Sequence, residues 1–172
     1  ERLERIKAQG TRLHFVSREA YRQRSDDDVI RMWMKQRGIA EDSFVIPEGA
    51  DNEQGRSGCV ELGALVPDHF DAVVCAMGTG STLRGMAEGV SHHTRVVGIP
   101  VGHFGRWDFT HPRIEIHTDY AWSGYGKSHP DLDEFIRLFS GNTGLPLEPV
   151  YTGKLFYGVT ELVKKGRFAP GE

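Results

Sequence analysis

Asp71-Ala-Val-Val-Cys-Ala-Met-Gly-Thr-Gly-Ser-Thr-Leu-Arg-Gly85 is the stretch that decides the fold of this 172-residue chain. Its apolar part, residues 72–77, has the length and composition of a buried parallel strand, and it runs directly into a glycine-rich turn that opens a helix. A second apolar run follows the expected helix at residues 95–101. Strand, helix and strand in this order predict a βαβ unit.

The turn Gly78-Thr-Gly-Ser-Thr82 has the composition of a phosphate-binding loop. Backbone N–H groups at the start of a helix have no partner within the helix, and glycine lets an anion approach them closely. Ser81 and Thr82 add hydroxyl donors. The loop alone does not choose between a nucleotide, a dinucleotide, pyridoxal phosphate and a tight strand-to-helix turn that binds nothing.

Two nucleotide-binding motifs come close to this loop but do not match it. A Walker loop places Gly-Lys-Ser/Thr after four residues, and no lysine follows Gly80. The dinucleotide motif G-x-G-x-x-G is approached by Gly78, Gly80 and Gly85, but the last interval is too long and no acidic residue ends the strand at 95–101. A nucleotide-binding α/β domain is therefore kept only as an alternative.

Composition and charge limit the class of protein. The formal net charge is -3 with basic and acidic residues interspersed, which gives no electrostatic basis for a nucleic-acid partner. No apolar run approaches the length of a membrane span, so we expect a cytoplasmic protein without a membrane segment. Cys59 and Cys75 do not form a Cys-x-x-Cys pair, and His92-His93 has no accompanying ligand pattern, so we expect free thiols and no metal site.

The rest of the chain alternates between expected strands and helices. Strands are expected at residues 11–16, 43–47 and 113–118, and helices at residues 2–9, 26–37, 57–66, 132–139 and 153–165. Ser25 is the expected N-cap of the second helix. This alternation predicts an α/β fold with a mostly parallel sheet between two layers of helices. The polar loop at residues 48–56 is the expected boundary between a smaller lobe, 1–56, and a larger lobe, 57–172.

Three motifs occur in a fixed order along the chain: Ile46-Pro-Glu-Gly-Ala-Asp-Asn-Glu-Gln-Gly55, Gly78-Thr-Gly-Ser-Thr82 and Pro149-Val-Tyr-Thr-Gly-Lys154, with Gly124-Tyr-Gly-Lys127 before the last. With these motifs the chain resembles the 1-aminocyclopropane-1-carboxylate deaminase and D-cysteine desulfhydrase family. The resemblance covers nearly the whole chain. It implies pyridoxal phosphate as cofactor, the tryptophan-synthase β fold (fold-type II), a small amino acid as substrate and a homodimer when the protein is intact.

The resemblance also implies roles for particular residues. The cofactor would be held by Gly78, Thr79, Gly80, Ser81 and Thr82 at its phosphate and by Thr152 at its pyridine nitrogen. Tyr151 and Tyr125 would be catalytic tyrosines beside the substrate, where a phenol exchanges a proton or orients an amino acid. Without the family, Tyr151 would be interpreted as a core tyrosine at a helix start and Tyr125 as a turn residue between glycines.

The residue at position 152 bears on the choice of substrate. The resemblance implies glutamate at this point in the deaminases and threonine in the desulfhydrases. Thr152 therefore favours β-elimination from an amino acid such as D-cysteine over opening of a cyclopropane ring. A hydroxyl at this point can bond to an unprotonated pyridine nitrogen. The expected products are a 2-oxo acid and ammonia, plus sulfide when the substrate is cysteine.

Two features that the family implies, an N-terminal segment with the cofactor lysine and a closing C-terminal strand, are expected to be missing from this chain. Family members are longer and carry the lysine that binds the cofactor in an Asn-Lys-x-Arg-Lys type of motif, which these 172 residues do not contain. Lys127 and Lys154 belong to other motifs. We therefore expect a piece or a truncated form of a pyridoxal-phosphate enzyme that is inactive by itself. The alternative is a non-catalytic module that binds a phosphate ligand or another protein.

Overall fold

The computed structural model describes residues 2–103, 107, 110–169 and 171. The chain divides into two compact units, Glu1–Pro47 and Glu48–Glu172, which are described separately. Within the described ranges no helix is long and apolar enough to cross a bilayer, and no three His, Cys, Asp or Glu side chains are grouped as metal ligands. Cys59 and Cys75 are free thiols. The lobe boundary expected between residues 56 and 57 stays a prediction.

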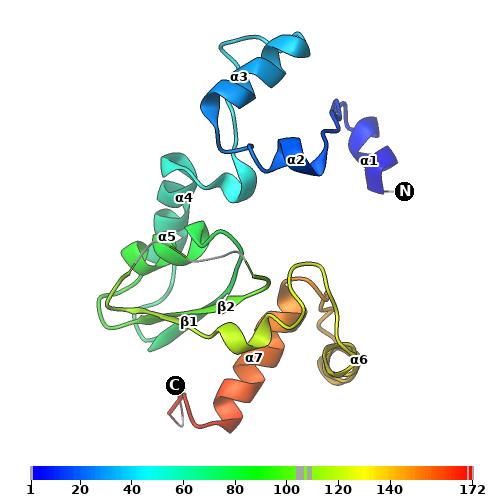
Figure 1. Ribbon diagram of the computed structural model, residues 1–172. Helices are drawn as coiled ribbons and strands as arrows, with labels where there is room; N and C mark the ends of the chain where they lie inside the picture. Colours follow the sequence, from blue (N-terminus) through cyan, green and yellow to red (C-terminus); the bar gives the residue numbers. More distant parts are fainter. Residues whose placement is uncertain (1, 104–106, 108–109, 170, 172) are drawn as a thin grey trace. The chain divides into compact units, whose positions relative to one another are not determined.

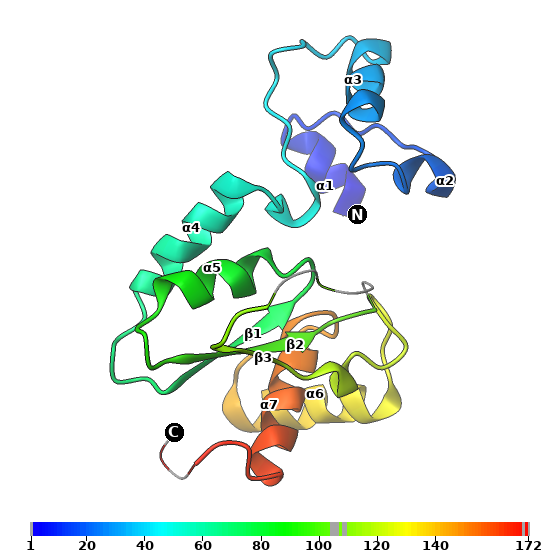
Figure 2. The same ribbon diagram turned by 60° about the vertical axis from the view of Figure 1, so that its left-hand side comes forward.

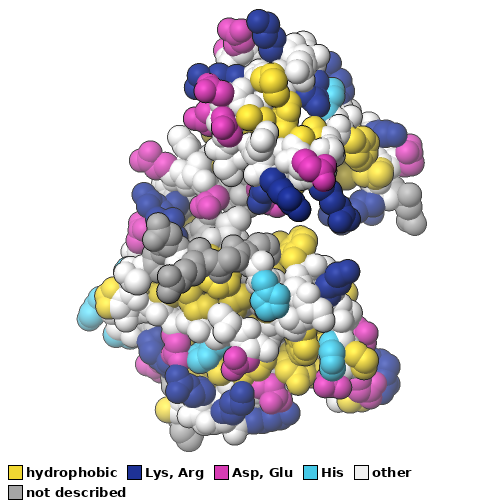
Figure 3. All heavy atoms as spheres, in the orientation of Figure 1, with side chains coloured by type: hydrophobic (Ala, Val, Ile, Leu, Met, Phe, Trp, Pro, Cys, Tyr) yellow, Lys and Arg dark blue, Asp and Glu magenta, His cyan; other side chains and the backbone are white. Residues whose placement is uncertain are grey.

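The first unit is built from short helices, α1 (Arg2–Ala8), α2 (Arg18–Tyr21) and α3 (Asp27–Gln36). None of its described residues is buried. Hydrophobic side chains lie at its surface between charged ones (Figure 3). Phe15 and Ile46 are the most exposed of its large hydrophobic residues. The described residues of this unit therefore bury no apolar core of their own.

Two expected features of this unit are wrong. The strands expected at residues 11–16 and 43–47 are irregular backbone, because a strand forms only where a neighbouring strand pairs with it, and the described residues of this unit contain no strand. The N-cap of α3 is Asp26 and not Ser25. Asp26 Oδ1 accepts the N–H groups of Asp28, at 2.9 Å, and of Val29, at 3.2 Å. Its negative charge also lies at the positive end of the helix dipole.

The second unit contains a parallel sheet. Its described strands lie in the order β1 (Ala72–Met77), β2 (Arg95–Pro100) and β3 (Ile114–Ile116). α5 (Ser81–Gly89) connects β1 to β2, which confirms the βαβ unit. β3 is shorter than the strand expected at 113–118.

Helices cover both faces of this sheet, as Figure 1 and Figure 2 show. The remaining elements of the unit are η1 (Glu48–Ala50), α4 (Glu53–Ala64), η2 (Thr118–Tyr120), α6 (Pro130–Thr143) and α7 (Thr152–Lys164). α4 and α5 lie on one face and α6 and α7 on the other, which confirms the three-layer α/β fold. α4 begins before the expected Ser57, because Asn52 Oδ1 accepts the N–H of Gly55 at 2.8 Å and caps the helix.

Two apolar clusters fill the spaces between the layers. The cluster around α5 contains Met77, Leu83, Met86, Ala87, Val90 and Val96. The cluster around α7 contains Val97, Ile99, Tyr120 and Leu162. Consecutive residues Val96 and Val97 belong to different clusters, as expected for a strand whose two faces are both buried. The first cluster anchors the helix whose start carries the glycine-rich loop.

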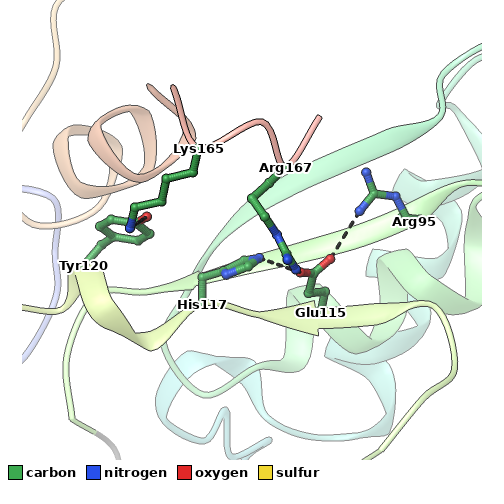
Figure 4. Close-up of polar contacts among 6 residues, drawn as sticks. All are labelled: Arg95, Glu115, His117, Tyr120, Lys165 and Arg167. Carbon is green, nitrogen blue, oxygen red and sulfur yellow. Dashed lines mark hydrogen bonds and ion pairs between the residues drawn. The ribbon is translucent and has the colours of Figure 1, made fainter. Parts of the chain in front are cut away.

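The segment that follows α7 is tied to the sheet by charged side chains (Figure 4). Glu115 on β3 accepts hydrogen bonds from Arg95, at 3.2 Å, and from Arg167, and it lies 2.9 Å from His117 Nε2. The hydrogen bond from Arg167 is the main reason that the pKa of Glu115 is lowered. An ionised Glu115 therefore holds the residues after α7 against β2 and β3.

Candidate functional site

The glycine-rich loop, residues 78–82, lies between the carboxyl end of β1 and the first turn of α5. Gly80 has φ 96° and ψ -3°, in the left-handed region, which explains why glycine stands here. Gly80 is also the N-cap of α5 and provides no side-chain capping bond, so the N–H groups of the first turn can bind an anion. Thr82 on that turn is exposed. Trp107 Nε1 donates to Gly78 O at 3.0 Å and steadies the start of the loop.

The polar loop before α4 packs against the glycine-rich loop. Ser81 Oγ donates to Asp51 Oδ1 at 2.6 Å, and Thr79 Oγ1 lies 3.1 Å from Ser81 Oγ. A Cβ atom at Gly49 would meet Thr79 Cγ2 at 2.8 Å, so the two loops are in direct contact. The motif at residues 46–55 and the glycine-rich loop at residues 78–82 therefore form one surface.

The bond between Ser81 and Asp51 affects how an anion could be bound. The single hydroxyl proton of Ser81 is given to Asp51, so the backbone N–H groups are the main donors left for an anion. Asp51 also brings negative charge to the loop. A hollow of about 480 Å³ at this place is lined by Asp51, Asn52, Glu53, Arg56, Ser81 and Arg84. The two arginines bring positive charge to the same hollow.

Two tyrosines meet next to this loop. Tyr151 OH donates to Tyr125 OH at 3.3 Å, and the rings lie edge to face with centroids 5.9 Å apart. A Cβ atom at Gly78 would lie 3.9 Å from the Tyr151 hydroxyl, so the pair stands close to the start of the loop. The hydrogen bond to Tyr125, followed by burial, raises the pKa of Tyr151 to about 12. Tyr151 is therefore a protonated donor at neutral pH.

Thr152, the first residue of α7, is bonded to Glu148. Glu148 Oε1 accepts the N–H groups of Tyr151 and Thr152, both at 2.6 Å, and Oε2 accepts that of Val150 at 2.7 Å. Thr152 Oγ1 accepts the Glu148 N–H at 2.9 Å. Burial raises the pKa of Glu148, but the hydrogen bonds outweigh it and the pKa is lowered. The carboxylate therefore caps α7 and orients Thr152.

Sequence reasoning missed two residues that support this arrangement. An acidic residue shortly before a helix start is a capping signal, so Glu148 could have been found. Lys154 is fully buried, and its Nζ donates to Val101 O, Ala121 O and Gly124 O. No local signal predicts this role for Lys154, because its partners are backbone carbonyl groups distant in sequence.

The structure brings together part of the site that the sequence predicts. Gly78 lies near Tyr151, which contacts Tyr125, and Thr79 lies beside Ser81. The remaining predicted residues are at helix starts: Gly80 and Thr82 at α5, and Thr152 at α7. The roles predicted for these residues in catalysis and cofactor binding stay predictions.

Comparison with known proteins points to one family. The family model described as "Pyridoxal-phosphate dependent enzyme" matches residues 1–172. A Pyrococcus furiosus protein, provisionally named a 1-aminocyclopropane-1-carboxylate deaminase, is 34% identical over 151 residues, covering 72% of this chain and 46% of the relative. A Thermotoga maritima protein with the same provisional name is 30% identical over 183 residues, covering 90% and 58%. The chain therefore spans about half the length of the curated relatives it matches.

A solved structure has the same arrangement of helices and strands. The crystal structure of a protein described as an ACC deaminase homologue matches this chain with a TM-score of 0.76 and 28% sequence identity. The match covers 94% of this chain and 56% of that one. The sheet and its two helical layers are therefore also found within a longer protein chain.

Proposed function

Because the chain belongs to the family of pyridoxal-phosphate dependent enzymes, we propose that it supplies the phosphate-binding lobe of an enzyme that acts on a small amino acid. Its fold is consistent with an incomplete fold-type II enzyme. One observation carries the proposal: the loop that leads into α5 starts at Gly78 beside a pair of tyrosines and ends at Gly80, an N-cap that provides no side-chain capping bond.

The loop residues fit a phosphate group. The N–H groups of the first turn of α5 supply donors, and Thr82 adds a hydroxyl. Among the residues that the structure describes, a Cβ atom at Gly78 would meet the Tyr151 hydroxyl alone, at 3.9 Å, so these residues leave space for a ligand over the loop. Pyridoxal phosphate, when bound, withdraws electrons from the α carbon of an amino acid and eases loss of its proton. Tyr151 and Tyr125 would bind the polar groups of the substrate through their hydroxyls.

Thr152 would bind the pyridine nitrogen. Its hydroxyl proton has two acceptors on Glu148, Oε1 at 3.3 Å and the backbone O at 3.4 Å. Both distances are long for a hydrogen bond, so giving up this bond for an unprotonated ring nitrogen costs little. A hydroxyl here favours elimination from an amino acid such as D-cysteine over opening of the 1-aminocyclopropane-1-carboxylate ring. In either case the products would be a 2-oxo acid and ammonia, and D-cysteine would also release sulfide.

The reaction also needs a lysine that binds the cofactor, and we place it outside these 172 residues. The family-type lysine motif is not among them. Lys154 is unsuitable, because its Nζ is buried and donates three hydrogen bonds. The chain by itself should therefore bind the cofactor without turning over a substrate.

The test is an absorbance titration of the chain with pyridoxal phosphate, followed by borohydride reduction and peptide mass mapping. We expect saturable binding that inorganic phosphate reverses and no lysine modified after reduction. A Gly80→Ala change puts a side chain in left-handed backbone at the loop, and the resulting strain should weaken binding about tenfold. Gly144→Ala is the matched control, because φ there is 73° and a Cβ atom would have open space at the end of α6.

Other outcomes of this titration would contradict the proposal. If both glycine variants bind like the unchanged chain, the loop does not hold the phosphate. A reduced adduct on one lysine of this chain would show that the chain carries its own cofactor lysine. The intact native protein should release sulfide and ammonia from D-cysteine; faster release of ammonia from 1-aminocyclopropane-1-carboxylate would overturn the choice of substrate.

A second candidate function is a non-catalytic module that binds a phosphate ligand. It is favoured by the lack of the family-type lysine motif in these 172 residues, because a module that only binds a ligand needs no cofactor lysine. Pyridoxal phosphate bound by the intact native protein, with turnover of neither amino acid, would support this module over the enzyme.

A further inference from the structure

We propose that Lys154 is a positioning residue whose buried ammonium group acts as a tethered cation, gathering three backbone carbonyl oxygens and thereby holding Tyr125 against Tyr151. The importance of this pair for catalysis rests on the proposed function. The geometric claim about the pair does not.

The ammonium group has a complete set of partners. Lys154 is 0% exposed, and its Nζ donates to Val101 O at 2.8 Å, to Ala121 O at 3.2 Å and to Gly124 O at 2.8 Å. An ammonium group has three N–H donors, so each one has an acceptor. A buried charge is stable only when it is paired or fully hydrogen-bonded, and here the partial negative charges of the carbonyl oxygens meet that need.

Two of these carbonyl groups belong to segments that meet at Tyr125. Gly124 directly precedes Tyr125, and Val101 directly precedes Gly102. A Cβ atom at Gly102 would lie 2.7 Å from Tyr125 N and 2.8 Å from Tyr125 Cβ, so the backbone of Gly102 touches this tyrosine. By holding both carbonyl groups, Lys154 fixes the two segments that surround Tyr125.

Helix α7 carries both Lys154 and, at its start, Tyr151. Lys154 follows Tyr151 by three residues, and residues at this spacing lie on the same face of a helix. The lysine therefore links the helix start that carries Tyr151 to the loop that carries Tyr125. Without the ammonium group, the carbonyl oxygens would lose their common donor and would repel one another, and the loop would move away from α7.

The test compares Lys154→Met with Lys164→Met in the full 172-residue chain labelled with 3-fluorotyrosine. Lys164 is on the same helix but is exposed, and its Nζ donates to Glu161 Oε1 at 2.8 Å. The fluorine resonances of Tyr151 and Tyr125 are assigned with phenylalanine variants of each. We expect both resonances to shift in Lys154→Met and to stay unchanged in Lys164→Met.

Ionisation of Tyr151 gives a second signature. Its pKa of about 12 depends mainly on the hydrogen bond to Tyr125, so loss of that bond should bring the pKa down toward the ordinary value of about 10. Burial lowers the pKa of Lys154, so the resonances are compared at neutral pH. In a pH titration, ionisation of Tyr151 should begin at a lower pH in Lys154→Met than in the unchanged chain. A folded Lys154→Met chain with unchanged tyrosine resonances and unchanged ionisation would overturn the proposal.

A smaller variant tests the tethered cation directly. Lys154→Ala leaves the carbonyl oxygens and removes the ammonium group. We expect added ammonium chloride, but not tetramethylammonium chloride, to restore the tyrosine resonances, or to restore folding if the variant does not fold alone. Equal effects of the two salts, or no effect of either, would overturn the proposal.

These measurements are independent of cofactor binding. A chain that fails to bind pyridoxal phosphate would refute the proposed function and leave the tyrosine measurements readable. A chain that binds the cofactor, but whose tyrosine pair ignores Lys154, would refute only the present inference.

Discussion

Replacing Gly85 by alanine should destabilise the chain, although alanine favours helices. Gly85 is a buried residue within α5, at the contact with α4. A Cβ atom there would lie 2.4 Å from Cys59 Cβ and 2.7 Å from Arg56 O. Carbon atoms in contact are about 3.5–4.0 Å apart, so the helices would have to separate by about 1 Å. The obstacle includes backbone of α4, which cannot turn away as a side chain could.

The magnitude follows from two opposing terms. Overpacking in a close-packed interior costs about 1–3 kcal/mol, and contact with backbone places Gly85→Ala near the upper end. Higher helix propensity of alanine offsets about 1 kcal/mol. The free energy of unfolding should therefore fall by about 2 kcal/mol, which corresponds to about 4–8 °C in Tm for a chain of this size. Separation of α4 from α5 should also weaken binding of pyridoxal phosphate at the loop.

Gly58→Ala is the matched control for this prediction. Gly58 is an exposed residue within α4, and a Cβ atom there would meet nothing within 4 Å. This change should stabilise the chain by about 0.5–1 kcal/mol. Urea unfolding followed by circular dichroism measures both variants in one buffer. A Gly85→Ala chain as stable as the unchanged chain, or a shift in the same direction for both variants, would refute the reasoning.

Three further predictions concern charge and protonation. Because the pKa of Glu115 is lowered in the folded chain, its ionised form stabilises the fold above about pH 4.3, and this stabilisation is lost as the pH falls through the folded pKa. Urea unfolding should therefore show Glu115→Gln to be about 1 kcal/mol less stable than the unchanged chain at pH 7 and equally stable near pH 2. A difference that stays constant with pH would exclude the ion pairs as its cause. Asp51→Asn removes negative charge beside Ser81 and should tighten pyridoxal phosphate binding about threefold in the absorbance titration; weaker binding would mean that Asp51 is needed to orient Ser81. Burial raises the pKa of Cys75 to about 11, which lowers the fraction of reactive thiolate at pH 8. In a Cys59→Ser chain, iodoacetamide should therefore modify Cys75 about a hundredfold more slowly in the folded state than in urea, as measured by peptide mass mapping. Equal rates in the two states would contradict an effect of burial.

Local sequence was sufficient for the centre of the fold. The apolar run at 72–77, the glycines after it and the run at 95–101 predict β1, the loop and β2, because each signal acts on neighbours in the chain. The same kind of signal failed at 11–16 and 43–47, where the described residues form no strand. An extended segment becomes a strand only when another strand pairs with it, and a local pattern does not say whether that partner exists.

By itself, the sequence determined the βαβ unit, the glycine-rich start of α5 and, through its motifs, the resemblance to one enzyme family. Only the tertiary structure decided that Tyr151 bonds to Tyr125, that Asp51 takes the Ser81 proton and that Lys154 gathers three carbonyl oxygens. The physical reason is that backbone conformation near a glycine or a helix start depends on adjacent residues, whereas these contacts depend on the path of the whole chain. Carbonyl oxygens are moreover the same in every residue, so no sequence pattern marks the ones that a buried lysine binds.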